Sequence, residues 1–394
     1  MEPKKDSDFS NVKHLGLVSF FTDLSSEMVF GLLPLFLTGP LGASRTLLGL
    51  VEGVAEMLGY TVRMASGVTS DRVQKRKPLV LIGYSLSAAS KPFFALAGGW
   101  ADAFAVRSAD RVGKGIRTAP RDALISESVP EAKVARAFGL HRSLDQAGAI
   151  IGPLVAFALF PFVGFAGVFY FSLVPGSIAV VILIFFVKEK FVPSSEVKRS
   201  IAGNIRHVLA EKKLVALLVI MGMFSVGAFN FSFVLIRASD LGVADSMVVL
   251  VYAVINTAHT LIGYPAGMLA DRVGKEKVLS ISYGIFLAST VLMLLSTSSA
   301  HAYLLAVVYG LYIGIAETVQ RAVVPKYVAS HMRGTAYGLY NMVIGSSFLV
   351  ANLVFGFLLD LSGMPAAALY SIVTSTVAIA GLVGFQTLTR SRGS

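Results

Sequence analysis

Several ionisable side chains lie inside apolar stretches of this chain, where they could bind protons or hold a charged solute. Asp23 and Glu27 are four residues apart in the apolar stretch 15–38, so a helix would place both on one face. A charged side chain inside a lipid bilayer costs on the order of 3 kcal/mol on insertion scales, and normally faces a bundle interior or a water-filled cavity. Both carboxyls are therefore candidates for proton coupling or substrate binding.

Other apolar stretches of the first half carry charges in the same way. Six charges of the stretch 102–124 fall within a helical sector of roughly 120°, namely Arg107, Asp110, Arg111, Lys114, Arg117 and Arg121. The stretch 78–98 has the single Lys91. The candidate proton-coupling and substrate residues of this half are Asp23, Glu27, Glu52, Glu56, Arg107, Asp110, Arg111, Lys114, His141, Arg142 and Asp145.

A buried carboxyl beside an arginine can act as a switch for protons. Burial disfavours the charged carboxylate, whereas an adjacent arginine favours it. Asp23 or Glu27 facing Arg107 or Arg111 would form a pair whose proton affinity changes when the contact changes between two states. His141 is a second candidate relay, since imidazole titrates near neutral pH. Alternatively, Arg107 is a strut between helices, and Glu52 only neutralises charges on neighbouring helices.

The composition places most of the chain in lipid. The 394 residues are 55% hydrophobic and 14% charged, with a mean hydropathy of +0.72. Soluble domains carry about 25% charged residues. The absence of cysteine excludes disulfides and thiolate metal sites. The fold expected is therefore an all-α membrane protein.

Apolar segments long enough to span a bilayer form two sets of six. The first set is at 15–38, 46–68, 78–98, 102–124, 136–160 and 166–187, and the second at 213–236, 246–269, 278–297, 302–324, 335–359 and 366–388. The sequence thus predicts twelve transmembrane helices in two six-helix bundles, 1–187 and 213–394. The segment 188–212 is predicted to be a cytoplasmic linker containing a short amphipathic helix.

Lysine and arginine in the short loops predict the orientation. The loop after the second span holds Arg72, Lys75, Arg76 and Lys77, while the opposite loops hold little beyond Arg45 and Arg237. We therefore expect a multi-pass protein of the cytoplasmic membrane with both termini cytoplasmic. This distribution accounts for the net charge of +11 without a nucleic-acid partner.

One phrase occurs twice, 200 residues apart. Residues 67–77 read GVTSDRVQKRK and residues 267–277 read GMLADRVGKEK. Six spans per copy is an even number, so both copies enter the membrane from the same side. The two bundles are thus a parallel repeat related by a pseudo-two-fold axis normal to the membrane. The glycine would let helices approach, and the aspartate could contact a helix N-terminus, so the predicted gate residues are Gly67, Asp71, Arg72, Gly267, Asp271 and Arg272.

The second repeat has neutral residues where the first has charges. Met223 and Gly227 stand at the positions of Asp23 and Glu27. A purely structural requirement for charge would appear in both repeats, so we expect the coupling chemistry in the first. The candidate substrate residues of the second half are Asn256, His259 and Glu317; for Asn256 and His259 the alternative is a satisfied polar group in the core.

The repeated Gly-x-x-x-Asp-Arg-x-x-(Lys/Arg) phrase and the two sets of six spans resemble the major facilitator superfamily (MFS). The stretch Arg107-x-x-Asp110-Arg111-x-Gly113 is similar to that family's Arg-x-x-Gln-Gly-x-Gly, departing at Asp110 and Arg111. Gly148-x-x-x-Gly152-Pro153 resembles the start of its antiporter-associated motif, without the trailing glycines. The resemblance covers the whole chain and implies a transporter working by alternating access, similar to prokaryotic drug–proton antiporters.

The function expected is proton-coupled secondary transport of a small organic solute, with efflux slightly favoured over uptake. The alternatives are divalent-metal transport, which the many arginines disfavour, and a non-transporting membrane sensor. No Ser-His-Asp order, phosphate-binding glycine loop or His-Glu-x-x-His motif indicates an enzyme or an ATP-driven pump. We expect a monomer with no cofactor and no bound metal, whose partners are the solute, protons and lipid.

Overall fold

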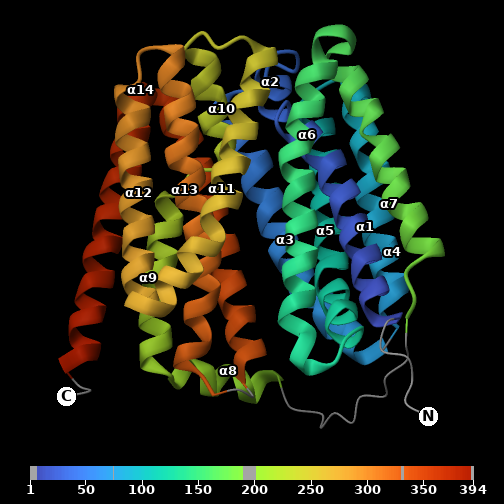
Figure 1. Ribbon diagram of the computed structural model, residues 1–394. Helices are drawn as coiled ribbons and strands as arrows, with labels where there is room; N and C mark the ends of the chain where they lie inside the picture. Colours follow the sequence, from blue (N-terminus) through green and yellow to red (C-terminus); the bar gives the residue numbers. More distant parts are fainter. Residues whose placement is uncertain (1–6, 74, 190–200, 330–331, 392–394) are drawn as a thin grey trace. The chain divides into compact units, whose positions relative to one another are not determined.

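The computed structural model describes residues 7–73, 75–189, 201–329 and 332–391. These residues form helices joined by short turns, and no strand occurs among them. The predicted all-α fold class is therefore confirmed for the described part of the chain (Figure 1).

Seven α-helices and two 3₁₀ turns are described before the predicted linker. They are α1 (Ser7–Phe30), α2 (Leu33–Thr38), α3 (Arg45–Val73), α4 (Arg76–Ser90), η1 (Lys91–Leu96), α5 (Trp100–Glu127), η2 (Glu131–Lys133), α6 (Val134–Phe171) and α7 (Leu173–Phe185). Gly31 and Pro34 interrupt the first predicted span between α1 and α2. Pro92 accompanies the change from α4 to η1, since proline cannot donate the backbone hydrogen bond that would continue an α-helix.

The second half of the chain has the corresponding elements. They are α8 (Ile201–Ala210), α9 (Lys212–Gly227), α10 (Phe231–Asp240), α11 (Asp245–Val273), α12 (Lys275–Leu295), α13 (Ser299–Val323), η3 (Val324–Tyr327) and α14 (Arg333–Ser391). The helix α8 lies within the predicted linker 188–212, of which residues 190–200 are outside the described part.

Eight helical stretches of the described residues are long and apolar enough to cross a membrane. Two of them, Val134–Phe185 and Arg333–Thr389, are 52 and 57 residues long, whereas one crossing needs about 20. Each turns at a glycine with positive φ, Gly164 at 62° and Gly363 at 74°, so each can hold two crossings. The more charged helices α3 and α5 have 29 and 28 residues, also enough to cross. The described helices thus accommodate the twelve predicted crossings.

The chain forms two compact units whose boundaries cut two helices. Unit 1 comprises residues 1–42, 58–196 and 245–253; unit 2 comprises 43–57, 197–244 and 254–394. The start of α3 belongs to unit 2 because its backbone touches α14: a Cβ on Gly49 would overlap the carbonyl oxygen of Asn352, and one on Gly356 would overlap that of Arg45. The units therefore differ from the sequence repeats at the starts of α3 and α11.

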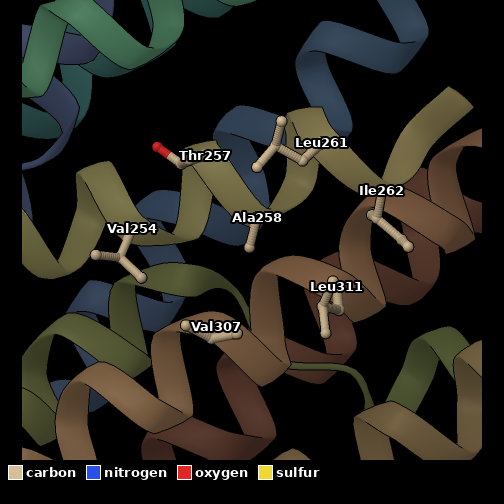
Figure 2. A pocket seen from close by; sticks show the side chains of 7 residues that line it. All are labelled: Val254, Thr257, Ala258, Leu261, Ile262, Val307 and Leu311. Atoms are coloured by element: carbon tan, nitrogen blue, oxygen red, sulfur yellow. The ribbon is translucent and has the colours of Figure 1, made fainter. Parts of the chain in front are cut away.

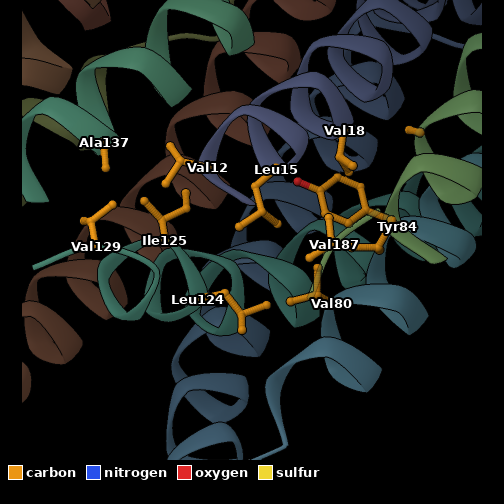
Figure 3. Packing of buried hydrophobic residues seen from close by; sticks show 12 residues of the cluster. Val12, Leu15, Val18, Val80, Tyr84, Leu124, Ile125, Val129, Ala137 and Val187 are labelled. Atoms are coloured by element: carbon orange, nitrogen blue, oxygen red, sulfur yellow. The ribbon is translucent and has the colours of Figure 1, made fainter. Parts of the chain in front are cut away.

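An apolar cluster holds the helices of unit 1 together at one end (Figure 3). From α1 it takes Val12, Leu15 and Val18, which are spaced three residues apart and fully buried. They pack with side chains of α4, α5, α6 and α7, namely Val80, Tyr84, Leu124, Ile125, Ala137, Ala179 and Leu183. Helical spacing of apolar residues thus fixes the face that α1 turns to its neighbours.

Helices α1 and α6 approach each other closely through glycines of α6. A Cβ on Gly148 would overlap the carbonyl oxygen of Phe20, and one on Gly152 would lie 2.9 Å from that of Leu24. Small residues allow such backbone contact between helices in lipid. The same contact places Asp23 of α1 beside Asp145 of α6.

We predict that Gly148→Ala lowers the free energy of unfolding by about 1–3 kcal/mol, because the added methyl group must displace a neighbouring backbone. The matched control is Gly139→Ala on the same helix, where a Cβ would meet nothing within 4 Å. Alanine there should leave stability unchanged or raise it by up to about 1 kcal/mol. Thermal unfolding in mild detergent measures both variants, and equal effects would contradict the close contact.

The N-terminus of α3 is capped from a distant helix. The Asp360 carboxylate of α14 accepts hydrogen bonds from Arg45 N at 3.1 Å, Thr46 N at 2.8 Å and Thr46 Oγ1 at 2.6 Å. Arg45 also pairs with Asp240 of α10 at 2.7 Å, with the two side chains 37% and 32% exposed. The carboxylate satisfies backbone N–H groups that have no partner within α3.

We predict that Asp360→Ala costs about 0.5–2 kcal/mol of stability, as loss of a helix cap does. Asp240→Ala, which removes only the exposed ion pair with Arg45, should cost no more than about 1 kcal/mol. Thermal unfolding of the two variants in the same detergent tests the difference. A larger loss for Asp240→Ala would show that the ion pair, and not the cap, holds this end of α3.

Candidate functional site

The central polar contact of unit 1 is a pair of carboxyl groups. The side chain of Asp23 on α1 is within hydrogen-bonding reach of Asp145 on α6. Two carboxylates accept hydrogen bonds but donate none, so a hydrogen bond between them would need a proton on one of them. The pair lies where the backbones of α1 and α6 touch at Gly148.

Cationic and hydroxyl groups surround this pair. Ser19 Oγ donates to Asp145 Oδ1 at 2.9 Å, and Arg142 Nη1 lies 3.2 Å from Asp145 Oδ2. Lys114 of α5 is near enough to act electrostatically on Asp23. Asp145 thus has a hydroxyl and a guanidinium as direct partners, whereas Asp23 has the charge of Lys114 nearby.

A chain of polar groups leads from the pair toward α5 and α4. Arg121 Nη1 lies 3.4 Å from Ser19 Oγ, and its Nη2 is paired with Asp122 at 2.7 Å. Tyr84 OH is 3.4 Å from the same Ser19 hydroxyl. Ser19 thus connects Asp145 to three elements, although the sequence analysis did not select it.

His141 lies one helical turn before Asp145 and is buried, with 4% of its surface exposed. Its Nε2 has no hydrogen-bond partner among the described residues. The ring therefore lies at the edge of the cluster, near enough to Asp145 to interact with its charge.

Glu27 contacts a residue of the second repeat. Its Oε2 accepts a short hydrogen bond from Tyr252 OH of α11, and both residues belong to unit 1. The sequence analysis missed Tyr252, since one tyrosine in an apolar span gives no signal of its own.

The fully buried Lys91 anchors a second polar group in unit 1. Its Nζ donates to Ser25 Oγ at 3.0 Å, and it interacts electrostatically with Asp110. Asp110 in turn accepts from Ser87 Oγ at 2.6 Å. A buried charge is tolerated only with such partners. The sequence signal for this residue was a lone lysine in an apolar stretch, immediately before Pro92.

Two arginines of α5 stack on one ring of α1. The guanidinium carbons of Arg107 and Arg111 lie 3.9 Å and 5.2 Å from the centre of the Phe30 ring. Arg107 Nη1 is also 3.8 Å from Asp110. These cation–π contacts lower the cost of burying the guanidinium groups.

The candidates of the second half lie in unit 2, where His259 Nε2 is 3.6 Å from Glu317 Oε2. Asn256 is buried on the same helix as His259. Glu52 and Glu56, although they belong to the first repeat, are also in unit 2, and Glu52 is 1% exposed. The first-half candidates therefore do not form one cluster within a single unit.

Unit 2 contains a pocket of about 400 Å³ between α11 and α13 (Figure 2). Its lining is apolar apart from the hydroxyl of Thr257, and consists of Val254, Thr257, Ala258, Leu261, Ile262, Val307 and Leu311. The five residues from α11 follow helical spacing along one face, which could have identified them in the sequence.

Among the predicted gate residues, Gly67 and Gly267 lie within α3 and α11. Asp271 and Arg272 are exposed near the end of α11, while the side chains of Asp71 and Arg72 are outside the described part of the chain. The gate assignment stays a prediction.

Comparison with known proteins identifies the scaffold. A model described as Major Facilitator Superfamily matches residues 15–236 and again residues 215–393. An MFS-type transporter of Methanocaldococcus jannaschii is 34% identical over 360 residues, 89% of each chain. The multidrug resistance protein MdtG of Proteus mirabilis is 30% identical over 170 residues, 42% of each chain.

A solved structure supports the same fold. A mutant of the nucleoside transporter NupG superposes with a TM-score of 0.80 over 96% of this chain and 99% of that chain, at 14% identity. An identity of 14% supports a shared fold but no statement about the solute. The chain therefore belongs to the major facilitator superfamily, and it is a membrane transporter rather than an enzyme.

Proposed function

We propose that this transporter is coupled to protons and that the Asp23–Asp145 pair is its proton-binding site. The observation that carries the proposal is the closeness of the two carboxyl groups, which places them where one proton can bridge both. Loss of that proton would leave two adjacent carboxylates that repel each other. Protonation therefore changes the interaction between α1 and α6 directly.

Positive charge to replace that of the released proton is available nearby, from Arg142, Lys114 and Arg121. Arg142 is half-exposed, with 53% of its side chain accessible, so it can move without unpacking the core. When the proton leaves, a closer approach of Arg142 or Lys114 would stabilise the second carboxylate. We propose that this rearrangement couples proton release to the transport cycle.

The proposed cargo is a small organic solute, with efflux favoured. The pocket of unit 2 offers apolar walls and a single hydroxyl, which suits an apolar body better than a hydrated ion. Among the relatives, the names of MdtG and of MdtH from Edwardsiella ictaluri describe multidrug resistance proteins. A positively charged solute would neutralise the carboxyl pair as a proton does, so the two would exchange.

We further propose that Asn256, His259 and Glu317 contact the solute from unit 2, and that the doubled loop phrase forms the gate. The excess of lysine and arginine in alternate loops supports a cytoplasmic-membrane protein with both termini inside. The proposed oligomeric state is a monomer. Metal transport is not favoured, since within the described ranges no three metal-ligating side chains come together.

We predict that Asp23→Asn lowers solute flux driven by a pH gradient by more than about tenfold, because the amide can still donate a hydrogen bond to Asp145 but cannot bind or release a proton. Solute exchange without a gradient should continue. The assay uses proteoliposomes and a panel of cationic drugs and small organic anions, with and without a pH gradient.

The matched control is Asp102→Asn, the same change at an exposed residue in the first turn of α5. It should transport like the wild type. Proton coupling through this pair is excluded if Asp23→Asn retains full gradient-driven flux of a solute that the wild type moves.

A further inference from the structure

We infer that Tyr252 is a positioning residue, which holds the Glu27 carboxyl of α1 by a hydrogen bond while the start of α11 lies against α1. The inference rests on the proposed proton-coupled function and adds a residue that links the carboxyls of α1 to the second repeat. Its basis is the hydrogen bond from Tyr252 OH to Glu27 Oε2.

The ring of Tyr252 packs into a space that is open because residue 31 is a glycine. A Cβ on Gly31 would lie 2.8 Å from Tyr252 Cδ1 and 3.4 Å from Val249 Cγ1, so only glycine leaves room at the junction of α1 and α2. Tyr252 is 3% exposed. The hydroxyl is therefore held by packing as well as by its acceptor.

This contact joins residues 225 positions apart, one in each sequence repeat. Residues 245–253 cluster with unit 1, although the remainder of α11 belongs to unit 2. Transport by alternating access requires such contacts between repeats to form in one state and break in another. When this contact breaks, Glu27 loses the hydrogen-bond donor that Tyr252 supplies.

The charged neighbours of Glu27 are few. Asp23 lies one turn before it on α1, and Lys91 of η1 acts on it electrostatically. Arg107 and Arg111 of α5 lie over Phe30, and Asp145 of α6 contacts Asp23. The adjoining helices α2 and α7 contain no titratable residue. Tyr252 is thus the donor that reaches Glu27 from the second repeat.

The repeat supports the choice of this position. At the offset of 200 residues, Tyr252 aligns with Glu52, which is 1% exposed and likewise lies in a helix start that clusters with the opposite repeat. Both copies therefore place a buried polar side chain at the same point, with different chemistry.

The test measures the contact directly and needs no identified solute. Because the chain lacks cysteine, Pro40→Cys and Met247→Cys introduce a unique pair of spin-label sites at the two sides of the contact. Pulsed electron paramagnetic resonance in liposomes then gives the distance distribution between the labels. The wild type should populate the associated distance, because the hydrogen bond holds the two helix ends together.

In this background, Tyr252→Phe should lower the ratio of associated to separated molecules by roughly tenfold, the effect of losing one strong buried hydrogen bond. Tyr264→Phe is the matched control, since Tyr264 is on the same helix and 77% exposed. It should behave as the wild type. A Tyr252→Phe profile that superposes on the control would overturn the inference.

Glu27→Gln separates the hydrogen bond from a general effect on folding. Adding Tyr252→Phe to Glu27→Gln should change the ratio of associated to separated molecules less than Tyr252→Phe does when Glu27 is retained. Additive effects of the two substitutions would overturn the inference.

If Asp23→Asn abolishes gradient-driven flux while Tyr252→Phe leaves the distances unchanged, the proposed function stands and this inference alone fails. If Tyr252→Phe shifts the distances while Asp23→Asn transports normally, the inferred contact stands and the coupling role of Asp23 fails.

Discussion

The polar interior of unit 1 depends on the backbone contact between α1 and α6. Because Gly148 has no side chain, the two helices approach closely and bring Asp23 within hydrogen-bonding reach of Asp145. A larger residue at position 148 would have to displace the neighbouring backbone of α1. The cluster of Val12, Leu15 and Val18 keeps α1 in the rotation that turns Asp23 toward α6. A steric feature of the backbone thus sets the chemistry that the side chains can perform.

The remaining charges of unit 1 follow from the low polarity of lipid. Lys91 is fully buried, and it is held by the Ser25 hydroxyl and the charge of Asp110. Arg107 and Arg111 instead use the face of Phe30. These interactions lower the cost of burying charge. Lys91, Arg107 and Arg111 thus have structural partners, whereas a hydrogen bond within the carboxyl pair would need a proton.

Much of the scaffold could be predicted from local patterns. Hydropathy located the crossings because each needs about twenty apolar residues, and the doubled phrase located the repeat. The helix breaks at Gly31 and Lys91 and the turns at Gly164 and Gly363 were not predicted. The contacts of Asp23 with Asp145 and of Glu27 with Tyr252 were not predicted either, and the expected pairing of Asp23 or Glu27 with Arg107 or Arg111 stays a prediction. Spacing along one helix does not reveal which residue of another helix lies opposite.

The sequence by itself determined the membrane environment, the two repeats, the superfamily and the set of buried charges, because these follow from composition, period and local motifs. Only the tertiary structure decided which charges meet. Asp23 and Asp145 are 122 positions apart, and Glu27 and Tyr252 are 225 apart. Their contacts depend on the rotation and separation of packed helices, which are set by small residues such as Gly148 and Gly31 on the opposing surfaces. That information belongs to pairs of helices and is absent from either one alone.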